Sequence, residues 1–186
     1  MSEFWWLRCS FMTNAIVLLY PNQLYADHPA IHKDRMHWLI EDLLFFGDSR
    51  YITRFHKMKL LLHRASMKHY ADEILGAGRY QHDYIEHQMI NDRLAYVFER
   101  LHQAGYTEVH VADPTDYMLE KRIRRYCKKF DLTLHWYESP NFLTPIDTMQ
   151  RYWDDKDGHD YHQTDFYIWQ RKRLGIMLED GEKPLG

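Results

Sequence analysis

Short, uninterrupted apolar runs alternate along this chain with longer amphipathic stretches, and this alternation restricts its fold more than any other feature. Strands are predicted at residues 15–20, 36–42, 82–87, 107–112 and 132–137, of which 15–20 is a continuous apolar run and 82–87 is short and polar. Helical periodicity occupies the intervals at residues 54–76, 92–103 and 116–129. Strands joined through crossover helices pair in parallel with right-handed connections. The sequence therefore predicts an α/β protein with a mainly parallel, five-stranded sheet.

Each of the three predicted helices carries apolar residues at helical spacing. They are Met58, Leu61, Leu62 and Ala65 in the first helix, Leu94, Val97, Phe98 and Leu101 in the second, and Leu119, Ile123 and Cys127 in the third. We expect the first helix to cross one face of the sheet. The basic run at 121–129 then forms the solvated side of the third helix, and Cys127 is a small buried hydrophobe.

The pattern changes after residues 138–140. A turn is expected at 141–145, a polar stretch at 154–162 and a helix from about 165 to 178. We predict an extension outside the fold at residues 1–12, an α/β domain at 13–140 and a loop and helical connector at 141–186. The last residues give no structural reason for the chain to stop, so we expect it to continue in a longer protein.

Composition excludes several classes of protein. The formal net charge is −3, with 24 Lys and Arg against 27 Asp and Glu, so bulk charge does not favour binding to nucleic acid. Cys9 and Cys127 are too few for a disulfide framework or a four-cysteine cluster, which fits a reducing compartment such as the cytoplasm. The stretch Phe4–Leu7 is too short for a signal peptide or a membrane span.

Polar residues follow the predicted strands where the ligand crevice of an open parallel sheet lies. They are Asn22 and Gln23 after the first strand, Glu41 and Asp42 after the second, His56 and Lys59 at the next helix start, and Asp113 after the fourth strand. Amides and carboxylates at these positions suit a phosphate or a sugar chain. An alternative interpretation is that Asn22 and Asp113 are ordinary turn and helix-capping residues.

Familiar catalytic motifs are absent from the sequence. No glycine follows the first strand, so a dinucleotide fingerprint and a P-loop are both excluded there, and no Gly-x-Ser-x-Gly elbow occurs. The pairs His63 with His69 and His82 with His87 have short spacings but lack a third ligand in the pattern. We therefore predict neither a catalytic residue nor a metal site.

Three separated stretches, in order, resemble a known family. They are Pro-Asn-Gln-Leu at 21–24 with His-Pro-Ala at 28–30, the stretch 55–60 running into 66–71, and the stretch 170–177. Together they resemble the photolyase-related branch of the photolyase and cryptochrome family, whose bacterial members include flavoproteins with an iron–sulfur cluster. The resemblance spans about residues 13–186, and 141–143 and 181–186 fit the same pattern.

The resemblance implies a Rossmann-like three-layer domain that houses an antenna chromophore, typically a ribityl-lumazine. Asn22, Gln23 and Glu41 would hydrogen-bond the ring or the ribityl hydroxyls, Leu24 and Asp113 would lie beside them, and His56 and Lys59 would form the rim. FAD, the 4Fe-4S cluster and the DNA contacts are expected in a carboxyl-terminal part. One departure from the family is that Pro21-Asn22 replaces its usual Gly-Asp, which removes a carboxylate from the proposed pocket.

Two other interpretations stay open. The chain could be a nucleotide-binding or regulatory α/β module without a chromophore, or a structural domain that docks a helical partner. For the docking interpretation, aromatic and apolar residues near the carboxyl terminus would form an adhesive surface and cause self-association. They are Tyr152, Trp153, Phe166, Trp169 and Met177.

Overall fold

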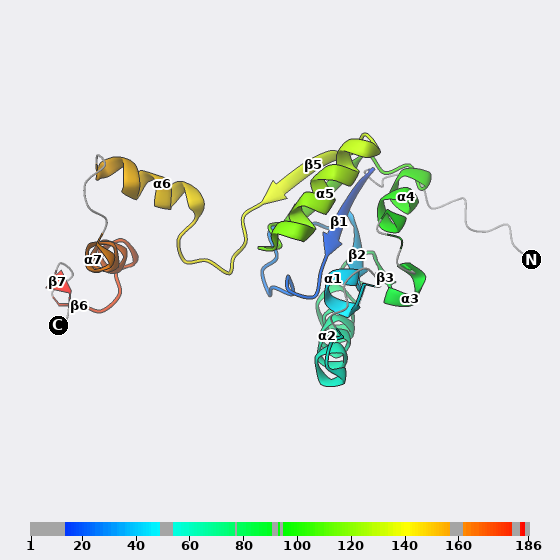
Figure 1. Cartoon of the computed structure of the whole chain (residues 1–186), viewed down its shortest axis with the longest axis horizontal. Helices are drawn as coiled ribbons and strands as arrows, with labels where there is room; N and C mark the ends of the chain where they lie inside the picture. The colour runs from blue at the N-terminus through cyan, green and yellow to red at the C-terminus, as the bar shows by residue number, and fades with distance from the viewer. Residues whose placement is uncertain are drawn as a thin grey trace, which may run out of the picture. The chain divides into compact units, whose positions relative to one another are not determined.

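The computed structural model of the chain centres on a parallel sheet with the strand order β3-β2-β1-β4-β5 (Figure 1). The strands are β1 (Ala15–Leu19), β2 (Met36–Ile40), β3 (His82–Ile85), β4 (Glu108–Ala112) and β5 (Thr133–Tyr137). The structure describes residues 14–48, 54–76, 78–90, 93, 95–156, 162–179 and 183–184. The predicted extension at residues 1–12 lies outside them.

Helices cover both faces of this sheet and complete the predicted three-layer α/β architecture. On one face, α1 (Leu43–Phe46), α3 (His87–Ile90), α4 (Tyr96–Gln103) and α5 (Tyr117–Lys129) pack on Ile16, Leu18, Ile40, Val109 and Val111. On the other face, α2 (Lys57–Tyr70) and the π-helical turn η1 (Ala71–Leu75) pack on Val17, Leu19 and Leu39. Because β1 is buried on both faces, its sequence is apolar throughout.

The α5 helix forms as its sequence predicts. It begins after Asp116, whose Oδ1 accepts a hydrogen bond from the backbone N–H of Leu119 at 3.0 Å. Leu119, Ile123 and Cys127 are buried, as the spacing predicts. Burial raises the pKa of the Cys127 thiol to about 12, so this cysteine is a packing residue and not a nucleophile.

The apolar stripe of α2 does not form the buried face of the helix. Met58, Leu61 and Leu62 are 64%, 60% and 65% exposed, whereas Met67 and Tyr70 are buried. At 3.6 residues per turn, Met67 lies on the opposite side of the helix from Met58. The helix therefore contacts the sheet through its carboxyl-terminal half and leaves the stripe uncovered within this unit.

The chain divides into two units, residues 1–141 and 142–186. The second contains α6 (Ile146–Asp155), α7 (Gln163–Leu174) and the antiparallel pair β6 (Leu178–Glu179) and β7 (Lys183–Pro184). Its α7 ends earlier than predicted, because Gly175 adopts the left-handed conformation (φ 67°) that terminates helices. Figure 1 draws α6 and α7 as the helices of this carboxyl-terminal unit.

Tyr152 is the buried centre of the second unit. Its ring centroid lies 5.1 Å from that of Phe166 and 4.9 Å from that of Trp169. Tyr152 is 3% exposed, so it belongs to an internal aromatic cluster and not to the adhesive surface that the sequence suggested. Trp153 and Met177, by contrast, are 42% and 58% exposed.

None of the described helices is both long enough and apolar enough to cross a membrane.

The two sides of α2 should differ in how much they stabilise the fold. We expect Met67→Ala to lower the free energy of unfolding by about 2–5 kcal/mol, because it leaves a cavity under the sheet. Leu62→Ala should change it by less than about 0.5 kcal/mol, because its side chain is in solvent. Urea denaturation of both variants tests this, and equal losses would contradict the assignment of the buried face.

Candidate functional site

The order of the sheet reverses at β1, so the candidate site is the region at the carboxyl ends of β1 and β4. Successive strands run from β1 outward to β2 and β3 on one side, and from β1 to β4 and β5 on the other. In open α/β sheets the ligand lies outside the strand ends at such a reversal. The structure brings Asn22 and Gln23 together there with the turn that contains Asp113 and Pro114.

Asn22 and Gln23 use their amides differently. Gln23 is fully buried, accepts a hydrogen bond from Tyr20 N at 3.2 Å and donates one to Ala112 O at 2.5 Å, so it ties β1 to β4. Asn22 donates from Nδ2 to Pro114 O at 2.6 Å. Its Oδ1 is buried and has no hydrogen-bond partner among the described residues. An acceptor is therefore left unused at the reversal point.

Asp113 and Leu24 shape the crevice through local structure. Asp113 Oδ1 accepts a hydrogen bond from Thr115 N at 2.7 Å, and its own N–H donates to Tyr137 O at 2.8 Å. It is thus a turn residue, while Asp116 caps the following helix. Leu24 is partly buried and packs against the cluster of Val17, Leu19 and Leu39.

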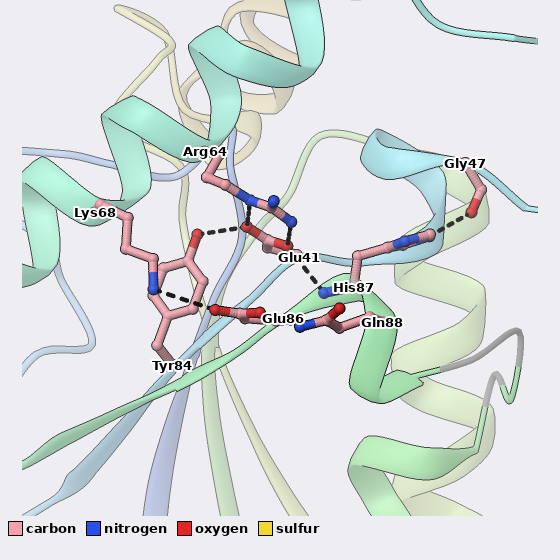
Figure 2. A network of polar contacts seen from close by, with 8 residues as sticks. All are labelled: Glu41, Gly47, Arg64, Lys68, Tyr84, Glu86, His87 and Gln88. Carbon is pink, nitrogen blue, oxygen red and sulfur yellow. Dashed lines mark hydrogen bonds and ion pairs between the residues drawn. The ribbon is translucent and has the colours of Figure 1, made fainter. Parts of the chain in front are cut away.

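Glu41, at the end of β2, is a buried carboxylate surrounded by donors (Figure 2). Arg64 donates from Nε to Oε1 at 2.6 Å and from Nη2 to Oε2 at 2.5 Å. Tyr84 Oη donates to Oε1 at 2.8 Å, and the backbone N–H of His87 donates to Oε2 at 2.9 Å. This carboxylate joins β2 to α2, β3 and α3, and its donors occupy both oxygens.

The charge of Glu41 is stabilised in place. Burial raises the pKa of this carboxyl, but the hydrogen bonds from Arg64, His87 and Tyr84 outweigh burial, so the net pKa is lowered from its usual 4.5. The pKa of Tyr84 is raised, first by burial and then by its bond to Glu41. The carboxylate is therefore ionised at neutral pH, and Tyr84 is its neutral donor.

Neighbouring side chains extend this network. Lys68 Nζ lies 3.6 Å from the centroid of the Tyr84 ring and 3.7 Å from Glu86 Oε1. The His87 ring lies 2.8 Å from Gly47 O, at the end of α1 (Figure 2). The loops after β2 and β3 are thereby held to each other and to α2.

His56 and Lys59 lie at the start of α2. The Nδ1 atom of His56 accepts a hydrogen bond from Met58 N at 3.2 Å and caps the helix, while Lys59 Nζ lies 4.4 Å above the Phe55 ring. Both side chains are exposed. Neither side chain makes a hydrogen bond to Glu41, Asn22 or Asp113 in the described part of the chain.

Asp42 forms a second ion pair at the end of β2. Its Oδ1 accepts a hydrogen bond from Leu44 N at 2.9 Å, which caps α1, and another from Arg122 Nη1 at 2.5 Å. Both side chains are 10% exposed. Arg122 thus departs from the predicted solvated face of α5, whereas Lys121, Arg124, Arg125, Lys128 and Lys129 are exposed as predicted.

Sequence analysis identified Glu41 but missed its partners. Arg64 and Tyr84 are 23 and 43 residues away along the chain, and His87 contributes only a backbone N–H. Arg64 lies among exposed residues on α2, so the helical periodicity of the sequence does not distinguish it from the other polar residues of that helix. A buried acidic residue at a strand end does indicate that a cation must come from another element.

Comparison with known proteins covers nearly the whole chain. Residues 17–186 match the family model for deoxyribodipyrimidine photo-lyase-related proteins. A protein of Acanthamoeba polyphaga mimivirus, named "uncharacterized protein R852", is 32% identical over 180 residues. That match covers 92% of this chain and 88% of the viral protein, so little of either sequence lies outside it.

The Glu41 network should give the fold a pH dependence. The carboxyl of Glu41 has a lower pKa in the folded chain than in the unfolded chain, where it is near 4.5. The ionised carboxylate therefore stabilises the fold above pH 4.5, and this stabilisation is lost as the pH falls through the folded pKa. Glu41→Gln should lower the free energy of unfolding by about 2 kcal/mol at pH 7, a figure kept low because Arg64 is half exposed.

The difference between wild type and Glu41→Gln should shrink below pH 4.5, as measured by urea denaturation from pH 7 to pH 3. Glu120→Gln is the matched control, because Glu120 pairs with Arg124 on the surface of α5 and contributes little. A constant difference across this pH range would contradict the assigned role of the carboxylate.

Proposed function

The chain belongs to the deoxyribodipyrimidine photo-lyase-related protein family, and on this premise we propose that residues 13–140 are the antenna domain of a photolyase-related flavoprotein. In this role the domain binds a ribityl-lumazine at the carboxyl ends of β1 and β4. The lumazine absorbs light and passes the excitation to a flavin in another part of the protein. The flavin then serves light-driven DNA repair or photoreception.

The observation that carries this proposal is the unused acceptor of Asn22. A buried carbonyl oxygen without a partner costs about 1–3 kcal/mol, and a ligand donor relieves that cost. A ribityl chain and a lumazine ring both offer such donors. The position of Oδ1 at the reversal of strand order supports a ligand site there, because ligands of open α/β sheets lie at this point.

The other site residues support Asn22 in this proposal. Gln23 and Asp113 fix the two turns that flank the crevice, and Leu24 contributes apolar surface. Glu41 positions the neighbouring loops, since its oxygens already accept four hydrogen bonds. His56 and Lys59 are the rim residues of this proposal, and both are exposed at the start of α2.

A 4Fe-4S cluster does not fit the residues of this chain. A cluster needs four thiolate ligands, whereas the chain has two cysteines, and Cys127 is a buried thiol with a raised pKa. We place the flavin, the cluster and the DNA contacts in a separate carboxyl-terminal region or a companion polypeptide. On this proposal the present chain does not repair DNA by itself.

Titration with a ribityl-lumazine tests the antenna role. We expect saturable changes in the absorbance and fluorescence of the ligand with wild type, and at least a tenfold weaker affinity with Asn22→Leu, which removes the acceptor. Thr133→Ala, an exposed residue at the amino end of β5, is the control and should bind normally.

Unchanged spectra at high micromolar lumazine would reject the antenna role. Tight binding of ATP or AMP in the same assay would favour a nucleotide-binding module instead.

A docking role is the second candidate, and exposed apolar side chains favour it. Met58, Leu61 and Leu62 form one uncovered stripe on α2, while Trp153 and Met177 are exposed in the second unit. Surfaces of this kind ordinarily meet a partner. We propose that they contact the flavin-binding region in the assembled protein.

The isolated chain should then self-associate through these surfaces. We expect light scattering to show a mass that rises with protein concentration, and Leu61→Lys with Leu62→Glu to reduce that rise without unfolding the chain. A clean monomer at millimolar concentration would contradict the docking role.

A further inference from the structure

Three potential metal ligands converge at β4 and β5, away from the proposed antenna crevice. Glu108 and His110 are two residues apart on β4 and so share a face, and His135 of β5 is paired in register with His110. The Oε2 atom of Glu108 lies 3.5 Å from Nε2 of His110 and 3.1 Å from Nε2 of His135. One ligand atom from each residue lies within 4.8 Å of the other two.

We propose that Glu108, His110 and His135 bind a zinc ion, with solvent in the fourth position. Two imidazoles and a carboxylate are an established donor set for zinc. With metal–ligand distances near 2.0–2.1 Å, tetrahedral geometry separates ligand atoms by roughly 3.3 Å. The distances of 3.1 Å and 3.5 Å from Glu108 bracket that separation before any ion is present.

A supporting hydrogen bond orients one of these ligands. The Oη atom of Tyr137 lies 2.9 Å from Nδ1 of the buried His110, which leaves Nε2 of the same ring facing Glu108. Metal-binding histidines commonly use their second nitrogen in this way.

Nε2 of His135 is available to a ligand. It lies 3.1 Å from Oε2 of Glu108, close enough for an ion pair, but makes no hydrogen bond to any described residue. The rings of His110 and His135 are nearly parallel, with centroids 4.3 Å apart and an interplanar angle of 6°. They must tilt for both lone pairs to reach one ion, and the His135 side chain, 42% exposed on edge strand β5, has room to do so.

The charges around the site are mixed. Glu108 supplies the negative charge that a divalent cation needs, whereas Arg35 is a cation that acts against further positive charge at His110. The guanidinium of Arg35 donates from Nη1 to Ala30 O at 2.8 Å, so it is held by the backbone. A bound ion would link β4 to edge strand β5, and binding to the folded state alone would raise the unfolding temperature.

Zinc titration of the full 186-residue chain tests this proposal. The chain is first stripped with a chelator, and ZnCl₂ is then added in a calorimeter. We expect one zinc per chain, a rise in unfolding temperature, and the visible absorption of tetrahedral cobalt when Co²⁺ replaces Zn²⁺. The variants His135→Ala and Glu108→Gln should lose the cobalt spectrum and bind at least about 100-fold more weakly.

Two further variants separate this site from adventitious binding. His69→Ala removes an exposed histidine of α2 and should bind zinc as wild type does. Tyr137→Phe removes the orienting hydroxyl and should keep one zinc per chain with roughly 10-fold weaker affinity. Both His135 and Glu108 are about half exposed, so their variants should fold, which urea denaturation checks.

Failure to bind zinc would overturn the proposal. So would equal affinity in wild type, His135→Ala and Glu108→Gln, because the contact would then be only an ion pair between Glu108 and His135. Neither result depends on lumazine binding, which involves the opposite ends of the strands.

Discussion

The burial of β1 on both faces is the constraint on which the rest of the structure depends. Residues Ile16–Leu19 have no exposed surface, so β1 must have a strand on each side and helices above and below. A parallel sheet that extends in both directions from its first strand must reverse its order there. The location of the candidate crevice thus follows from five apolar residues.

The buried polar groups at the strand ends also need hydrogen-bond partners. Gln23 bonds to backbone groups of Tyr20 and Ala112, and Glu41 accepts hydrogen bonds from α2, β3 and α3. A buried carboxylate is costly unless every oxygen is paired, so the position of Glu41 fixes the position of Arg64. These polar groups order the loops that apolar packing alone would leave undetermined.

The sequence predicts β1 because it is a continuous apolar run, and α5 because its apolar residues repeat with the helical period. The same reasoning assigns α2 correctly as a helix, but it does not find the buried side. The stripe at Met58, Leu61 and Leu62 is more regular than the pair Met67 and Tyr70, yet only the pair reaches the sheet. Periodicity indicates an apolar face, whereas the length of the sheet decides which part of a helix it can cover.

Long-range polar partners lie beyond this kind of reasoning. The partners Asp42 and Arg122 are 80 positions apart, and Glu41 and Tyr84 are 43 positions apart. The pattern of charges along the chain does not predict either pair. The cluster of Glu108, His110 and His135 is similar, because it needs the register of β4 with β5. The Glu-x-His spacing on β4 places Glu108 and His110 on one face, and the pairing with β5 brings His135 beside them.

Pro21 and Asn22 have a specific structural role at the end of β1. Asn22 donates from Nδ2 to the carbonyl oxygen of Pro114, which an ionised aspartate could not do because two acceptors would face each other. Pro21 is buried and starts the turn that Gln23 closes onto Tyr20. The amide therefore fastens the β1 turn to the β4 turn and still presents Oδ1 as an acceptor. A carboxylate at this position would attract a ligand cation or donor more strongly, but it would lose the hydrogen bond to Pro114 and leave the bond from Gln23 to Ala112 to hold the two strand ends together.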